Sequence, residues 1–182
     1  MKIERLKGIE TTNIQVSDRI RVDHYTATCQ AASQRGAIFL LDQYLDKPMP
    51  MNAEETNEGG YESSDLRKAL QSDEVLSIFN VIRDRMAPFE NGDLLRIPFA
   101  GEIFGDKLPE WCEPDGHEQW PLMQDRRNRI ASMYEWGWLQ NKDKTSSRLF
   151  CFVTDYGCVA SGIASGILGV RPVFMVTEEA AR

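Results

Sequence analysis

The sequence lacks the features that assign a chain to several familiar classes of protein. It has only four cysteines and two histidines, and no two cysteines have the CxxC spacing of a zinc site. No apolar run approaches the length needed to span a bilayer. Residues 1–7 include several charged side chains, and no apolar stretch follows them. We therefore expect no secretory signal, reduced cysteines, and a cytoplasmic or virion-associated protein.

Motifs of common enzyme classes are also missing. The sequence contains no Gly-x-Ser-x-Gly element, no phosphate-binding loop and no dinucleotide fingerprint. His24 and His117 are the only histidines that could act as bases. These absences favour a non-enzymatic role, and no cofactor is predicted.

Acidic residues outnumber basic ones, so the chain carries a net charge of -7. A nucleic-acid backbone and an anionic membrane both repel such a protein, so we expect neither as a partner. Arg126, Arg127 and Arg129 form a local basic cluster, which is typical of a solvated face.

What is present is an ordinary globular composition, with 42% hydrophobic and 27% charged residues among 182. This predicts a single domain over residues 1–182 with a sizeable core. Alternating apolar residues predict strands near 19–22 and 25–31. The apolar run 37–41 predicts a central strand that is covered on both faces.

Two helices are expected next. Ser63 or Ser64 can cap a helix over about 64–71, because a serine hydroxyl accepts a hydrogen bond from a free amide of the first turn. A second helix is predicted over about 74–86 by apolar residues at helical spacing, and Pro88 would end it. Proline and glycine predict a long loop over 48–61.

The remaining chain predicts irregular structure followed by antiparallel strands. Long loops are expected over 106–135 and 140–148. Residues 150–153 and 158–161 flank Thr154-Asp155-Tyr156-Gly157, which predicts a hairpin turn. A final strand is expected over 170–176.

Four segments together resemble a family of bacterial and phage-associated domains of unknown function. The matching segments are Gly59–Arg67, Leu95–Gly105, Trp138-Leu139 and the closing Gly169–Phe174. The resemblance covers about residues 15–176. That family is remotely similar to the C-type-lectin-like fold of formylglycine-generating enzymes and of retroelement-diversified phage receptor-binding proteins. The resemblance implies an α+β, C-type-lectin-like domain with mostly antiparallel short strands, two helices and long loops.

The resemblance leaves three functions open, because this fold supports both binding and catalysis. The first is a non-enzymatic module that binds a protein or a glycan. The second is a copper oxidase of the formylglycine-generating type, with Cys151 and Cys158 as metal ligands, since thiolates suit Cu(I). The third is a structural virion subunit that associates with itself.

Aromatic and polar loop residues are the candidates for ligand binding. We expect Trp136 to point to the face opposite Trp138, which makes Trp136 the better ligand candidate. The predicted ligand-binding residues are Asn128, Arg129, Trp136, Asp155 and Tyr156.

Three residues are instead expected to be structural. Trp138 fits a core position, and Arg171 has five donors with which to satisfy loop carbonyls. Pro172 removes one donor from the strand ladder.

The acidic loop 113–125 leaves calcium binding open, although a solvated loop is the favoured interpretation.

Overall fold

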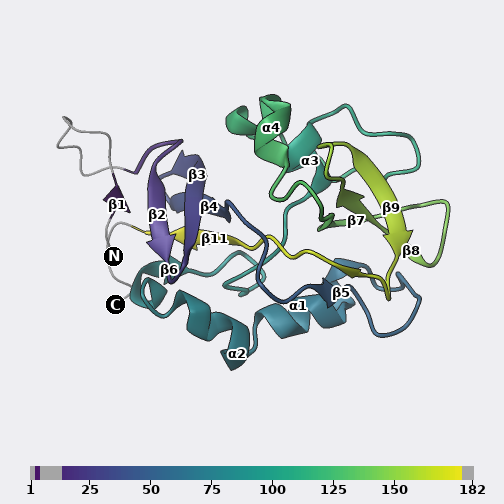
Figure 1. Cartoon of the computed structure of the whole chain (residues 1–182), viewed down its shortest axis with the longest axis horizontal. Helices are drawn as coiled ribbons and strands as arrows, with labels where there is room; N and C mark the ends of the chain where they lie inside the picture. Colours follow the sequence, from purple (N-terminus) through teal and green to yellow (C-terminus); the bar gives the residue numbers. More distant parts are fainter. Residues whose placement is uncertain (1–2, 5–13, 178–182) are drawn as a thin grey trace. The chain divides into compact units, whose positions relative to one another are not determined.

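The computed structural model describes residues 3–4 and 14–177. The interpretation of residues 1–7 therefore falls, apart from 3–4, outside the described residues. The described chain is α+β with short, mostly antiparallel strands, which confirms that part of the predicted fold class (Figure 1). It divides into two compact units. Unit 1 comprises the described residues of segments 1–43, 70–96 and 172–182, and unit 2 comprises 44–69 and 97–171. A single domain stays a prediction.

Unit 1 is built on one six-stranded sheet in the order β1-β2-β3-β4-β11-β6 (Figure 1). Its strands are β1 (Ile3–Glu4), β2 (Arg19–Val22), β3 (Tyr25–Ser33), β4 (Gly36–Leu41), β6 (Met86–Ala87) and β11 (Val173–Val176). The predicted strands near 19–22, 25–31 and 37–41 are therefore confirmed. β4 lies between β3 and β11, which explains its nearly continuous apolar sequence.

The core of unit 1 is aromatic. The rings of Phe39 and Phe174 stack with their centroids 5.8 Å apart, and Phe79 meets Phe174 edge-on at 5.2 Å. All three side chains are fully buried. Since large buried aromatic rings contribute much of a domain's hydrophobic stabilisation, this cluster anchors the sheet.

The predicted helix over 74–86 is wrong in its extent. The structure has a short α2 (Asp73–Leu76), then 3-10 turns η2 (Ser77–Phe79) and η3 (Arg83–Arg85), and then strand β6. Val75, Phe79, Ile82 and Met86 are nevertheless buried. A 3-10 turn repeats about every three residues, so it buries nearly the same positions as an α-helix does.

Unit 2 consists of short elements joined by loops. They are β5 (Met49–Pro50), η1 (Tyr61–Ser63), α1 (Asp65–Leu70, all but its last residue), α3 (Ala100–Phe104), η4 (Pro121–Gln124), α4 (Arg126–Arg129), β7 (Gly137–Lys142), β8 (Leu149–Val153), β9 (Val159–Ile163) and β10 (Ile167–Leu168). β7, β8 and β9 form an antiparallel sheet (Figure 1). β5 pairs with β10 in a second, two-stranded sheet.

Local sequence predictions hold in several parts of unit 2. Ser64 caps α1, since its hydroxyl accepts a hydrogen bond from the Arg67 amide at 3.1 Å. The turn at 154–157 joins β8 to β9, with the Thr154 amide donating to the Cys158 carbonyl at 2.8 Å. In unit 1, the final strand is shorter than predicted, because β11 begins at Val173 rather than at 170.

Two glycines, Gly137 and Gly169 of the closing motif segment, make room for one tyrosine. A Cβ atom at Gly169 would lie 2.6 Å from Cγ of Tyr44, and a Cβ at Gly137 would also overlap the ring. The two glycines are linked by a parallel bridge. Glycine is therefore required at both positions because the buried Tyr44 ring lies directly against the backbone.

Candidate functional site

Four exposed side chains of unit 2, three of them aromatic, come from two segments that meet at Trp136 and Asp155. Met133, Tyr134 and Trp136 lie before β7, and Tyr156 lies in the turn between β8 and β9; we call these four residues the aromatic surface. Their exposed fractions are 74%, 90%, 45% and 69%. A cluster of exposed aromatic residues and methionine is typical of binding surfaces.

Trp136 links the two segments of the aromatic surface. Its ring stacks on Phe152 of β8, with centroids 5.0 Å apart and planes 9° apart. Its indole Nε1 donates a hydrogen bond to Oδ1 of Asp155 at 3.0 Å. Both contacts fix the ring while almost half of it faces solvent, so a partner can pack on it at little conformational cost.

The turn that carries Tyr156 is held by α4. The Tyr156 carbonyl accepts a hydrogen bond from Nε of Arg126, and Gly157 packs beside the Arg126 backbone and Ile130. The Tyr156 ring itself stays exposed. The backbone of the turn that carries Tyr156 is therefore fixed by contacts within unit 2.

Asn128 and Arg129, two further predicted ligand-binding residues, are engaged with the protein. The side-chain Nδ2 of Asn128 donates to the Leu122 carbonyl at 2.8 Å, and Nε of Arg129 donates to the Met123 carbonyl at 2.8 Å. The Arg129 guanidinium also lies over the Phe104 ring at 5.2 Å. Both side chains therefore have structural roles, in addition to any contact with a ligand.

The residues that were expected to be structural lie in buried positions. Trp138 is 1% exposed, and its Nε1 donates to the Met49 carbonyl at 2.9 Å. Nη1 of Arg171 donates to the carbonyls of Asn128 and Arg129 at 3.2 and 3.4 Å. Pro172 is also buried, and within unit 1 its carbonyl accepts a hydrogen bond from the Leu41 amide at 3.1 Å.

Asp115 of the acidic loop accepts hydrogen bonds from within the loop and from neighbouring segments. The Asp115 carboxylate accepts from the Gly101 amide at 2.8 Å, from Nδ2 of Asn141 at 2.7 Å and from the His117 amide at 2.8 Å. It thereby fixes the start of α3. Within the described residues, no group of three or more histidine, cysteine or acidic side chains is arranged to hold a metal ion.

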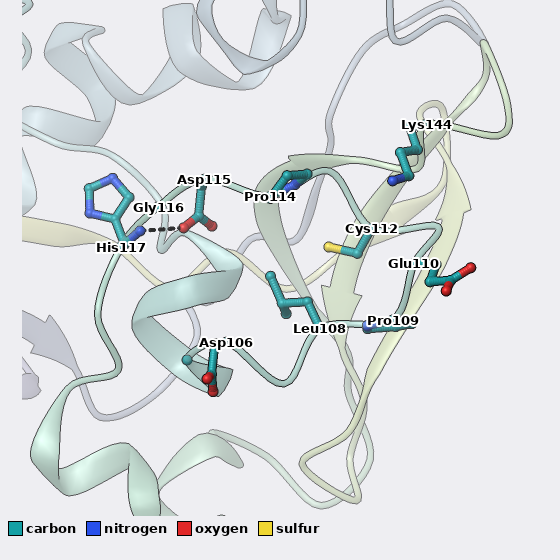
Figure 2. A pocket seen from close by; sticks show the side chains of 11 residues that line it. Asp106, Leu108, Pro109, Glu110, Cys112, Pro114, Asp115, Gly116, His117 and Lys144 are labelled. Carbon is teal, nitrogen blue, oxygen red and sulfur yellow. Dashed lines mark hydrogen bonds between the residues drawn. The ribbon is translucent and has the colours of Figure 1, made fainter.

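This loop borders a pocket of about 440 Å³ (Figure 2). Its lining comprises Gly105, Asp106, Leu108, Pro109, Glu110, Cys112, Pro114, Asp115, Gly116, His117 and Lys144. In Figure 2 the Cys112 side chain lies between Pro114 and Leu108, with the His117 imidazole at the far end of the labelled group. That imidazole stacks on Phe99, with centroids 4.0 Å apart.

The cysteines pair differently from the predicted alternative. Sγ of Cys151 lies 3.3 Å from Sγ of Cys112, and both residues are buried. In the β8–β9 ladder Cys151 lies opposite Ser161, whereas Cys158 is exposed at the end of the turn. The structure thus places Cys151 and Cys158 in separate environments.

Sequence reasoning missed Met133, Tyr134 and Cys112 as candidate residues. Two large apolar side chains within a polar, irregular segment are a usable signal for the first two. Cys112 carries no local signal, because its partner lies 39 residues further along the chain.

Comparisons with known proteins assign the chain to no family. No family model matches the chain, and no curated protein or solved structure matches it significantly. Among the described residues, no helix has both the length and the apolar character needed to cross a bilayer.

Proposed function

We propose that this chain is a non-enzymatic binding module that recognises a protein partner through the aromatic surface. The observation that carries the proposal is Trp136, an exposed ring that is immobilised by Phe152 and Asp155. Fixed tryptophan and tyrosine side chains dominate the binding energy of protein interfaces, because they bury a large area and lose little conformational freedom.

Neighbouring charge supports a protein as the partner. Arg126 and Arg127 are exposed on α4, close to the turn that carries Tyr156. Aromatic residues, methionine and arginine are the types enriched at protein interfaces. A glycan remains the other ligand class that flat aromatic rings can bind, so the test includes it.

The resemblance to phage-associated domains supports the same assignment. We propose that the fold is a variant of the C-type-lectin-like fold, in which a short antiparallel sheet supports long recognition loops. The protein would act in the bacterial cytoplasm or on a virion. The copper-oxidase alternative with Cys151 and Cys158 has no support from the geometry, because these residues do not face each other across the hairpin.

The test compares three forms of the purified chain: the wild type, the double variant Trp136→Ala/Tyr156→Ala, and the control Ile167→Ala. Ile167 is 66% exposed in unit 2 but lies outside the aromatic surface. Proteins crosslinked to the wild type in lysate of the producing cells are identified, and the best candidate is purified for measurement of its Kd. We expect the double variant to weaken binding at least about 100-fold, since two interface aromatic residues contribute about 2 kcal/mol each.

Circular dichroism and urea unfolding verify that the double variant is folded. Equal affinity for the purified partner in all three forms would contradict the proposal. Binding on a glycan array that depends on Trp136, with no protein partner, would also overturn it. Concentration-dependent dimerisation by light scattering that the double variant abolishes would replace the foreign partner with a second copy of this chain.

A further inference from the structure

We propose that Cys112 and Cys151 are a redox-active pair that hydrogen peroxide converts into a reversible disulfide through the pocket beside Cys112. This inference is independent of the proposed function, because it concerns other residues. The two sulfur atoms lie 3.3 Å apart on segments separated by 39 residues. A disulfide bond is about 2.05 Å long, so a movement of little more than 1 Å closes the pair.

The surroundings of the two thiols assign them different tasks. Cys112 lines the pocket, whereas Cys151 lies in the middle of β8 and is fully buried. The pocket holds about 440 Å³, and peroxide is little larger than water. Cys112 is therefore the thiol that meets the oxidant, and Cys151 is the resolving thiol.

The hydrogen bond between the thiols prepares Cys112 for attack. The Cys151 thiol donates to the Cys112 sulfur, and this bond lowers the pKa of Cys112 despite its burial. The same bond, together with burial, raises the pKa of Cys151. A thiolate is the reactive form of cysteine, so the order of reaction follows the geometry.

The chemistry balances in two steps. The Cys112 thiolate attacks one oxygen of hydrogen peroxide, and the O–O bond breaks. Hydroxide departs and is protonated to water, and Cys112 becomes a sulfenic acid. The Cys151 sulfur then attacks the Cys112 sulfur, the S–O bond breaks, and a second water leaves with the Cys151 proton. Two thiols lose two electrons, and a dithiol reductant returns them by thiol–disulfide exchange.

The other two cysteines serve as internal controls. Cys29 is fully buried in unit 1, and burial raises its pKa to about 12. Cys158 is exposed, with Nη2 of Arg126 at 3.6 Å from its sulfur. Cys158→Ser therefore provides a background that prevents disulfides between molecules.

The experiment treats folded Cys158→Ser protein with a small molar excess of hydrogen peroxide. Intact mass spectrometry is expected to show the loss of two hydrogen atoms, and free thiols in denaturant should fall from three to one. A peptide map should contain Cys112 linked to Cys151, and dithiothreitol should restore all three thiols. Adding Cys112→Ser or Cys151→Ser should abolish the mass loss.

Some results would overturn the proposal. One is a peptide map of the oxidised Cys158→Ser protein that links Cys29 to Cys112 or to Cys151 in place of the proposed pair. A second is peroxide treatment that stops at oxygen adducts without linking Cys112 to Cys151. A third is a bound metal ion, found by elemental analysis, that protects both thiols from oxidation. Because the peptide map uses protein that retains both cysteines, the test does not depend on the folding of the cysteine variants.

Discussion

Unit 1 is stabilised by a six-stranded sheet with an aromatic core, whereas unit 2 combines small sheets with many buried polar side chains. The buried polar residues of unit 2 are Asn52, Asn57, Ser64, Glu102, Gln140, Asn141, Asp143 and Arg171, and those described in unit 1 are Thr28, Gln30 and Asp93. Sheet ladders satisfy the backbone of unit 1, but the loops of unit 2 need side chains as partners.

The difference extends to the surface and to reactivity. The exposed aromatic residues and the close thiol pair both belong to unit 2. Loops that are fixed by specific hydrogen bonds can hold such groups in place, while a sheet mainly provides stability. We infer that unit 1 is chiefly structural and that unit 2 carries the function.

The largest expected effect is in the aromatic core of unit 1. Phe174→Ala should lower the free energy of unfolding by about 3–5 kcal/mol, because it leaves a cavity beside Phe39 and Phe79. Urea unfolding followed by circular dichroism measures the loss, and Val81→Ala, at a position 50% exposed, is the control. A loss below about 1 kcal/mol would contradict the interpretation of unit 1 as an apolar core.

A smaller but still large effect is expected at Asn141 in unit 2. Its Oδ1 accepts from the Ala100 amide at 2.7 Å, and its Nδ2 donates to the Glu113 carbonyl at 2.8 Å. Asn141→Ala leaves these buried groups without their partner and should cost about 2–3 kcal/mol in unfolding free energy. Urea unfolding of this variant beside the exposed Asn80→Ala tests the contrast, and equal stability of the two would refute it.

The smallest expected effect is pH-dependent. Burial acts to raise the pKa of Asp143, but hydrogen bonds from Thr145 and Ser161 outweigh it and hold the pKa below its ordinary value of 3.8. A folded-state pKa below the unfolded one means that the carboxylate stabilises the fold above about pH 4 and loses this contribution as the pH falls. Asp143→Asn should therefore cost about 1–2 kcal/mol at pH 7 and progressively less below pH 4.

Urea midpoints at pH 7 and pH 3 measure this change, with the exposed Asp84→Asn as the control. A difference between Asp143→Asn and wild type that is the same at both pH values would show that the amide, rather than the charge, is responsible. That outcome would weaken the view that buried charge and its hydrogen bonds hold the loops of unit 2.

Sequence patterns predicted the local elements better than the site. Alternation located β2 and β3, the apolar run 37–41 located β4, and a serine before Asp65 located the start of α1. The same periodic reasoning extended a helix through 86, because burial alone does not distinguish an α-helix from successive 3-10 turns. For the site, the expectation that Trp136 and Trp138 lie on opposite faces is wrong, because residues two apart on a strand share a face and both rings contact Phe152. They differ in exposure instead, at 45% and 1%, since Trp136 lies before the start of β7.

By itself, the sequence determined the α+β class and the strand patterns, since these depend on neighbouring residues along the chain. It also supplied the closing Gly169–Phe174 segment, whose arginine binds loop carbonyls. Only the tertiary structure decided that Gly137 and Gly169 enclose Tyr44, that Trp136 is held against Phe152, and that Cys112 meets Cys151. Each of the three joins segments that lie far apart in the chain, where no local propensity acts.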